Sequence, residues 1–115
     1  MGKTSLKSMS FEAIDAVAMR FRALSEVSRL YIVQALQSGE KNVSDLVELT
    51  GLSQPNVSRH LSILVTSGLI GKRKEGLNVV YKIIDEHLED LCAIVCKSVS
   101  AHSTKKAKAL KVKKS

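Results

Sequence analysis

One stretch of this chain, from Gly51 to Ile83, constrains the fold more than any other. It reads GLSQPNVSRHLSILVTSGLIGKRKEGLNVVYKI. Ser53 is a favourable helix N-cap, Pro55 suits the first turn of a helix because it has no N–H bond to lose there, and Gly68 ends the segment. Two runs rich in β-branched and basic residues follow, separated by a second turn. The stretch therefore predicts a turn, a helix and a β-hairpin in succession.

The predicted helix after Ser53 has one apolar and one polar face. Val57, Leu61 and Leu64 recur at helical spacing and are expected to be buried. The polar side chains at the start and flank of the helix are expected on or near its accessible surface: Gln54, Asn56, Ser58, Arg59, His60 and Ser62. A helix with polar groups at its start can enter the major groove of DNA.

Each of these polar residues has an expected role. Arg59 is expected to contact guanine or phosphate, while Gln54 or Asn56 is suited to reading adenine. Ser53 is expected mainly as the cap, although the backbone N–H groups around it can meet a phosphate. His60 is a candidate DNA contact, with packing or capping as the alternative.

The hairpin that follows supplies a basic wing. Its first strand is predicted from Leu69, its return strand spans 79–83, and Gly76 and Asn78 mark the turn. The basic residues at or near its tip are Lys72, Arg73 and Lys74. A solvated turn whose charge is partly offset by Glu75 is the simpler interpretation. Their place directly after a recognition helix favours phosphate contact instead.

Three further helices are predicted before this stretch. Apolar residues at helical spacing indicate a helix over roughly 10–24, and Ser25 is expected to cap a second helix near 26–37. A short third helix is expected to start after Ser44 and to end at Gly51. With one helix after the hairpin, the predicted fold is mainly α with a small β-hairpin wing, a winged helix-turn-helix.

The last predicted helix carries an apolar stripe. Its members are Ile84, Leu88, Leu91, Cys92, Val95 and Val99. This is more apolar surface than one small core should need, which suggests a partner subunit and a dimeric fold. The alternative is that the stripe packs on the first helix within one chain.

Charge alone does not identify a nucleic-acid partner. The 115 residues carry a net charge of +7, but six of the 18 basic residues are lysines of the final segment, and the remaining 12 nearly balance 11 acidic residues. The expected organisation is a flexible N-terminus at 1–9, one DNA-binding and dimerisation domain at 10–102, and a basic tail at 103–115. With no membrane-spanning run or secretory signal evident, the chain is expected to be cytoplasmic.

The chain resembles the ArsR/SmtB family of bacterial and archaeal repressors. The resemblance rests on FRALSEVSRLYIVQAL (Phe21 to Leu36), on GLSQPNVSRHLSILVTSGLI and on KRKEGLNVVYKI, and it covers roughly residues 10–100. It implies a homodimer formed through the first and last helices, which binds palindromic operator DNA and releases it when an inducer binds. It also implies repression.

Two metal sites that recur in the family are incomplete here. The segment 43–47, which matches a paired-cysteine motif of the third helix, has no thiol. Asp85 and His87 match the first half of a last-helix zinc site, but the second half falls on Ser98 and Ala101, neither of which suits zinc. Asp85 is better explained as a helix-start residue and His87 as a surface residue.

Cys92 and Cys96 are the best candidate sensor. They lie four residues apart on one predicted helix, so both sulfurs can face the same way, and a two-fold axis nearby would gather four thiols. Such a set suits a soft metal ion or metalloid, or a thiol oxidant that links subunits. The alternative is a constitutive DNA-binding protein whose cysteines only pack. No nucleophile with a base, complete metal site or phosphate loop indicates an enzyme.

Overall fold

The computed structural model describes residues 5–102, so the first four residues and the predicted basic tail at 103–115 lie outside the described part. The chain forms two compact units, Met1–Asp85 and Glu86–Ser115. The five expected helices and the hairpin are confirmed, and the structure adds a short 3₁₀ helix and a third strand.

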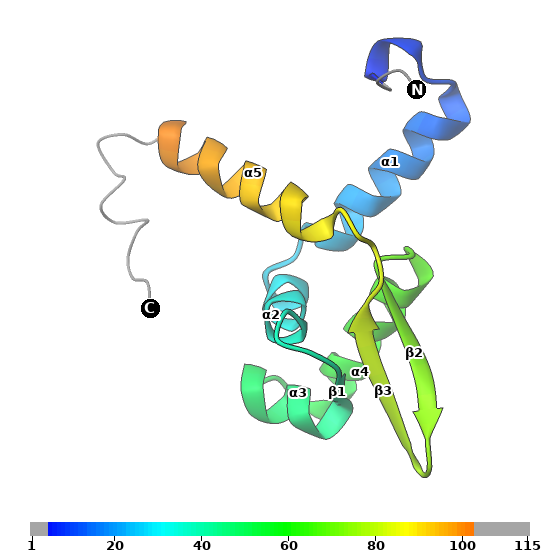
Figure 1. Ribbon diagram of the computed structural model, residues 1–115, viewed down its shortest axis with the longest axis vertical. Helices are drawn as coiled ribbons and strands as arrows, with labels where there is room; N and C mark the ends of the chain where they lie inside the picture. The colour runs from blue at the N-terminus through cyan, green and yellow to red at the C-terminus, as the bar shows by residue number, and fades with distance from the viewer. Residues whose placement is uncertain (1–4, 103–115) are drawn as a thin grey trace. The chain divides into compact units, whose positions relative to one another are not determined.

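The first unit contains four α-helices and a small sheet (Figure 1). Its elements in chain order are η1 (Leu6–Ser8), α1 (Phe11–Leu24), α2 (Val27–Leu36), β1 (Lys41–Asn42), α3 (Val43–Thr50), α4 (Gln54–Thr66), β2 (Ile70–Glu75) and β3 (Asn78–Ile83). Helices α3 and α4, joined by a three-residue turn, form the helix-turn-helix.

The start of α3 differs from the prediction. The helix begins at Val43 and not after Ser44, because Asn42 is its N-cap. The Asn42 side chain accepts from the Asp45 backbone N–H at 2.8 Å, and the Asp45 carboxylate accepts from the Asn42 N–H at 3.0 Å. This reciprocal capping box satisfies two N–H groups that a helix start leaves unpaired. Gly51 closes the helix in the left-handed region with a φ of 77°, as expected.

The start of α4 follows the prediction closely. The Ser53 hydroxyl accepts from the Asn56 N–H at 3.3 Å, and Pro55 lies in the first turn. Gly51 ends α3 and Ser53 caps the start of α4 two residues later. These two local features fix the position of the exposed start of α4.

The junction of α1 and α2 is held by an arginine, whereas the prediction assigned a capping role to Ser25. The Ser25 hydroxyl donates back to the Arg22 carbonyl at 2.9 Å, and the N-cap of α2 is Glu26, which makes no side-chain capping bond. The Arg29 guanidinium donates to the Ala23 carbonyl at 2.6 Å and to the Arg22 carbonyl at 3.2 Å. It thereby satisfies the Ala23 carbonyl, which the end of α1 leaves unpaired, and adds a further donor to the Arg22 carbonyl.

The sheet has the strand order β1-β3-β2. Strands β2 and β3 pair antiparallel from Ile70 with Ile83 to Glu75 with Asn78, and β1 pairs with the outer edge of β3. The turn contains Gly76, whose φ is 66°. The two-residue strand β1 is too short to show the alternation from which strands are predicted.

A small apolar core joins these elements. Seven side chains of the first unit are less than 3% exposed: Ile32, Leu46, Val57, Leu61, Leu64, Leu69 and Ile70. Burying a side chain of this kind contributes about 1.5–3 kcal/mol. Four helices and the base of the hairpin supply or flank these residues, so α4 and the wing are anchored to the same core.

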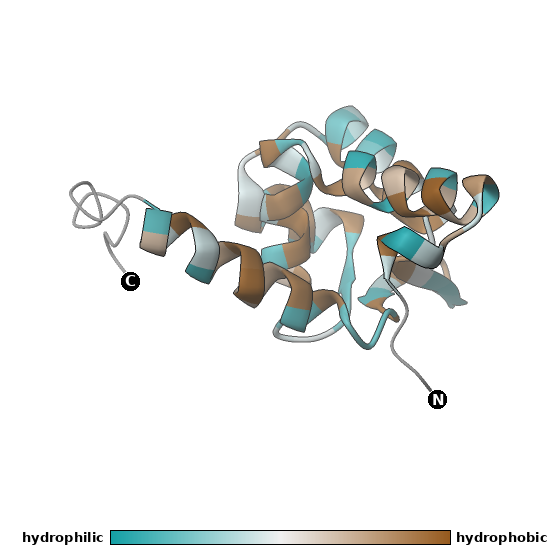
Figure 2. Cartoon of the chain, turned by 90° about the horizontal axis from the view of Figure 1, so that it is seen from above, coloured by the Kyte–Doolittle hydropathy of each residue, from teal (hydrophilic) through white to brown (hydrophobic). Residues whose placement is uncertain are grey.

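The second unit contains α5, which spans Leu88–His102. Hydrophobic residues lie along its whole length (Figure 2). Several remain exposed, including Ile94 at 64%, Val95 at 48% and Val99 at 46%. Among residues 5–102, no helix is both long and apolar enough to cross a membrane.

Candidate nucleic-acid interface

Helix α4 divides into a buried and an exposed face, as its periodicity predicts. Val57, Leu61 and Leu64 have no measurable exposure. The exposed face carries Gln54, Asn56, Ser58, Arg59 and Ser62. These side chains offer both hydrogen-bond donors and acceptors, and none is acidic. The surface therefore has the chemistry that base edges and phosphates require.

Arg59 is the cation on the exposed face of α4. Its Nη2 donates to the Asn56 Oδ1 at 3.3 Å, a long hydrogen bond between exposed groups. A hydrogen bond of this kind contributes little, so both side chains can exchange it for a stronger partner. Ser53, in contrast, is engaged as the helix cap.

The expectation that His60 lies on the accessible surface is wrong. Its side chain is 3% exposed and faces inward beside Val57 and Leu61. The Arg29 Nη1, which can only donate, lies 3.1 Å from the His60 Nδ1, so the imidazole is neutral at that nitrogen and accepts. Burial lowers the pKa of His60, and the Arg59 and Arg29 charges act in the same direction against an opposing effect of Glu26.

The wing is basic along β2, with its tip formed by other residues. Lys72 pairs with Tyr81 and Lys74 with Val79, while the turn itself consists of Gly76 and a fully exposed Leu77. The basic residues expected at or near the tip therefore lie on the strand that leads to it, with Lys74 nearest the turn. Lys72 and Lys74 alternate with Arg73 and so lie on the opposite face of β2.

Arg73 is occupied by two carboxylates. Its Nη1 lies 2.6 Å from the Glu40 Oε2 and its Nη2 lies 3.0 Å from the Glu75 Oε2. The hydrogen bond from Arg73 lowers the pKa of Glu40, and the two carboxylates raise the pKa of Arg73. Within the described residues, Lys72 and Lys74 have no such partners, which leaves them as the available cations of β2.

A groove connects the start of α4 with the wing. Its volume is about 450 Å³, and the residues around it come from β1, α3, α4, the hairpin turn and β3. The polar side chains among them are Asn42, Ser44, Gln54, Asn78 and Tyr81. Only Gln54 is a predicted DNA contact; the others come together because the sheet folds beside the start of α3, which local sequence patterns do not reveal.

Both candidate sensor residues are free thiols on α5. Cys96 is exposed, while Cys92 is half-buried and burial raises the pKa of its thiol. A raised pKa keeps more of Cys92 in the less reactive thiol form. Cys96 is the more exposed of the two residues. Within residues 5–102, no group of three or more metal-ligating side chains is assembled.

Asp85 has a structural partner. Its carboxylate pairs with the Arg20 guanidinium of α1, within the first unit. His87 lies 3.6 Å from the Glu86 carboxylate and is 80% exposed on its side chain. Asp85 therefore pairs with α1 and lies before the first residue of α5, Leu88, so the expected helix-start role is not what the structure shows, whereas His87 lies at the surface as expected.

Comparisons with known proteins place this chain in a family. Residues 26–72 match the sequence profile described as "Bacterial regulatory protein, arsR family". A probable mercury resistance operon repressor of Streptomyces lividans is 40% identical over 77 residues, which cover 67% of this chain and 62% of that protein. The transcriptional repressor SmtB of Mycobacterium tuberculosis is 36% identical over 77 residues, 67% of this chain and 57% of that protein. The chain thus spans about six-tenths of the length of these relatives.

A solved structure extends the match over the whole fold. It is a homodimeric winged helix-turn-helix DNA-binding domain of Mycobacterium bovis, described as a possible ArsR-family transcriptional regulator. It has a TM-score of 0.72 and 30% identity, and the match covers 92% of this chain and 94% of that one. These proteins are transcriptional regulators and not enzymes, and the Mycobacterium bovis structure shares the winged helix-turn-helix fold with this chain. This chain is a member of the ArsR family of winged helix-turn-helix transcriptional regulators.

Proposed function

We propose that this protein binds double-stranded operator DNA as a homodimer and represses transcription from it. The observation that carries the proposal is the exposed face of α4, which presents polar and cationic side chains without a carboxylate, together with an available pair of lysines on the wing. The names of the relatives as repressors support it. A regulator of this kind acts where the DNA is, in the cytoplasm.

The exposed start of α4 is suited to the major groove. Arg59 can give up its long hydrogen bond to Asn56 and donate to guanine or to phosphate, and the Gln54 and Asn56 amides match the edge of adenine. Ser58 is placed for a hydroxyl contact on the same face. Lys72 and Lys74 would then contact flanking phosphates, whereas Arg73 contributes less because Glu40 and Glu75 hold it.

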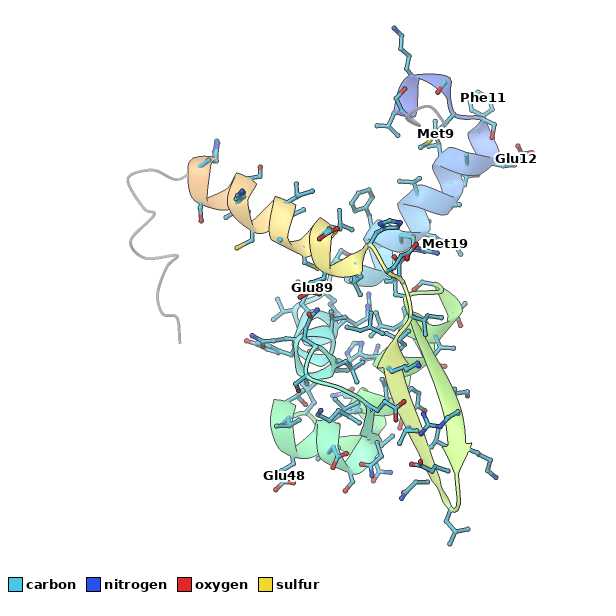
Figure 3. All side chains as sticks on the ribbon, viewed as in Figure 1. Met9, Phe11, Glu12, Met19, Glu48 and Glu89 are labelled. Carbon is cyan, nitrogen blue, oxygen red and sulfur yellow. The ribbon has the colours of Figure 1, made fainter. Side chains whose placement is uncertain are left out.

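Exposed apolar side chains support the dimer. On α1, Phe11 is 87% exposed and Phe21 53%, and on α5 Ile94, Val95 and Val99 are all exposed. Figure 3 shows Phe11 projecting from the first turn of α1. Apolar surface of this extent on both helices is costly in water and is suited to a partner subunit. A two-fold dimer would present two copies of α4 to successive major grooves, which are about 34 Å apart.

The proposed signal is a thiol-reactive or soft-metal inducer at Cys92 and Cys96. The exposed Cys96 would react or bind first, and Cys92 lies one turn away on α5. Since one chain assembles no group of three ligands within the described residues, the site would need thiols from both subunits. The mercury resistance named for one relative is consistent with a soft ion. An inducer held there would favour a dimer geometry that no longer fits the operator.

A constitutive DNA-binding protein is the second candidate. The half-buried position of Cys92, with its raised pKa, favours it because a packing cysteine has these properties. In that case the two thiols stabilise the fold and no inducer acts through them.

The test is operator binding by fluorescence anisotropy. A high-affinity DNA site is first selected from a random pool with the purified, reduced protein, and an Arg59→Ala variant should then bind it at least about tenfold more weakly. Failure to select a site, or full affinity in Arg59→Ala, would contradict the proposed interface.

The sensor is tested on the same DNA. The complex is titrated separately with arsenite, cadmium, zinc, a polysulfide and a peroxide, in parallel with a Cys92→Ser/Cys96→Ser variant. Release of the native protein by one agent, with the variant spared, supports sensing by the thiols and identifies the class of inducer. Equal responses, or none, support the constitutive alternative.

A further inference from the structure

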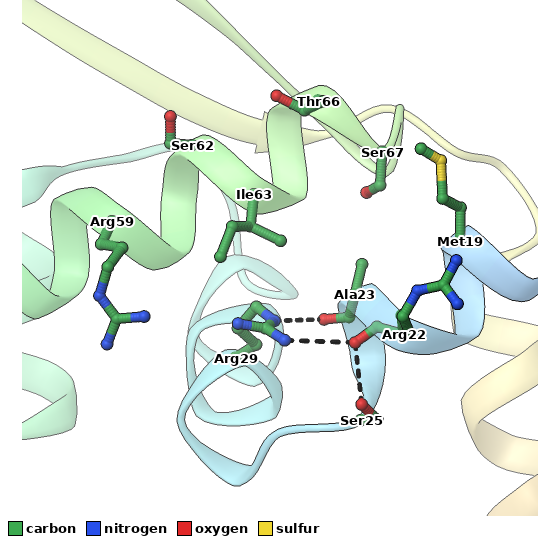
Figure 4. Close-up of a pocket in the computed structure, with 10 residues that line it drawn as sticks. All are labelled: Met19, Arg22, Ala23, Ser25, Arg29, Arg59, Ser62, Ile63, Thr66 and Ser67. Carbon is green, nitrogen blue, oxygen red and sulfur yellow. Dashed lines mark hydrogen bonds between the residues drawn. The ribbon is translucent and has the colours of Figure 1, made fainter.

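A second hollow lies on the first unit, and no residue of the wing lines it. Its volume is about 670 Å³, and it opens between the end of α1, the start of α2 and the outer side of α4 (Figure 4). Its apolar floor is formed by Met19, Ala23 and Ile63. Hydroxyl groups and three arginines surround that floor, and none of the lining residues is acidic. Pockets of roughly 300–1,000 Å³ are of the size that holds a small organic molecule.

The three arginines differ in how many hydrogen-bond partners they have within the protein. Arg29 is fixed by the carbonyls of Arg22 and Ala23 and by Glu26 at 3.2 Å. By covering these carbonyls, Arg29 removes the partial negative charge that the end of α1 would otherwise present to the hollow. An anion in the hollow would therefore lie near the Arg29 guanidinium, whereas the uncovered carbonyls at the end of α1 would repel it.

Arg22 and Arg59 are available to a ligand. The Arg22 guanidinium makes no hydrogen bond or ion pair within the described residues, and Arg59 makes only its 3.3 Å hydrogen bond to Asn56. Figure 4 shows the two guanidiniums toward opposite ends of the hollow, with Ile63 and Ala23 between them. Guanidinium groups bind carboxylates through two parallel hydrogen bonds, and an apolar body would cover the floor.

We propose that this hollow binds a small organic anion with an apolar body, such as an aromatic carboxylate. Arg22 anchors the carboxylate, and the apolar body lies on Met19, Ala23 and Ile63. No covalent step is involved.

The site shares one residue with the proposed DNA interface. Arg59 lines the hollow and also belongs to the exposed face of α4. A bound anion attracts the Arg59 guanidinium into the hollow and withdraws it from DNA. The anion and the operator therefore weaken each other's binding by the same factor. This consequence rests on the proposed DNA-binding function, whereas the site itself does not.

The site is tested by calorimetric titration of the DNA-free protein with naphthoate. Neutral naphthylmethanol is the matched ligand, since it keeps the apolar body and lacks the charge. Arg22→Gln should weaken naphthoate binding about tenfold and leave naphthylmethanol unchanged, because it removes one charged, two-pronged interaction. Lys7→Gln, which removes an exposed cation elsewhere in the first unit, is the control for net charge.

The two halves of the proposal fail separately. No naphthoate binding, equal binding of the neutral ligand, or equal weakening in Arg22→Gln and Lys7→Gln would overturn the site. Binding with the expected charge dependence, together with unchanged operator affinity at saturating naphthoate, would overturn the sharing of Arg59. If the protein bound no DNA at all, the titration would still decide the site, so failure of the DNA proposal is distinguishable.

Discussion

Replacing Arg29 by methionine should destabilise the protein strongly, although no sequence motif singles out this residue. The side chain of Arg29 is 12% exposed. Its guanidinium donates to the Ala23 and Arg22 carbonyls and lies 3.1 Å from the His60 Nδ1, so it joins α1, α2 and α4. Methionine retains an unbranched apolar stem and removes every donor.

The magnitude follows from the acceptors that are left without their donor. The Ala23 carbonyl belongs to a buried residue, and the His60 Nδ1 is in a side chain that is 3% exposed. An unsatisfied buried acceptor costs about 1–3 kcal/mol, whereas the exposed Glu26 pair contributes about 0–1 kcal/mol. The expected decrease in the free energy of unfolding is about 3 kcal/mol. Each kcal/mol lowers the Tm of a domain of this size by about 4–8 °C.

The assay is urea unfolding followed by circular dichroism at one fixed protein concentration, since a dimer's stability depends on concentration. Arg22→Met is the matched control, because its exposed guanidinium has no partner in the described part of the chain, and it should stay within about 0.5 kcal/mol of the native protein. Arg29→Lys should fall between them, since one ammonium cannot reach all three acceptors. If Arg29→Met matched Arg22→Met, the assigned role of Arg29 would be refuted.

Three further predictions concern other parts of the structure. Because burial lowers the pKa of His60, the unfolded chain binds a proton at this residue more readily than the folded protein does. The contribution of His60 to stability should therefore be full above its pKa in the unfolded chain, about 6.5, and should fall as the pH drops below that value. His60→Gln should lose this pH dependence, as measured by urea unfolding over a range of roughly pH 5 to 8. In operator titrations at several salt concentrations, log K falls as log salt rises. Lys72→Gln/Lys74→Gln should make this negative slope shallower by about 0.9 for each phosphate that is no longer neutralised, and Arg73→Gln should make it shallower by less. Gly51→Ala should cost about 1 kcal/mol in urea unfolding, because the φ of 77° is left-handed although an added Cβ meets nothing within 4 Å.

Each of these has a contradicting result. Unchanged pH dependence in His60→Gln would mean that another group titrates. A larger slope change for Arg73→Gln than for the lysine pair would mean that the carboxylates do not hold Arg73. Full stability of Gly51→Ala would mean that the turn between α3 and α4 tolerates a side chain.

Local signals were sufficient for the helix-turn-helix. The Ser53 cap, Pro55 in the first turn and the spacing of Val57, Leu61 and Leu64 all act within a few residues, and the structure confirms each. The position of His60 was also within reach, because it lies three residues after Val57 and one before Leu61, on the same helical face. The prediction placed His60 at the surface because the side chain is polar, although its position on the helix places it on the buried face.

Features that depend on tertiary packing were not predictable. Glu40 and Arg73 are 33 residues apart and meet only through the register of β1, β3 and β2. Arg29 similarly gains its role from the end of α1 and from a histidine on α4. The Asn42 capping box was readable as Asn-x-x-Asp, but Ser44 competes as a cap two residues later.

The pairing of Arg73 with Glu40 and Glu75 gives the wing and α4 different roles in the proposed complex with DNA. Arginine fixes a phosphate in one geometry through its planar fork, whereas a lysine ammonium on a flexible stem acts as a point charge that tolerates many positions. With its arginine held by carboxylates, the wing keeps lysines for the phosphate backbone: Lys72 and Lys74 on β2, and the exposed Lys82 on β3. Such a wing would hold the protein near DNA while letting it slide along the helix in search of a site. Stopping at the correct site would then depend on α4 alone.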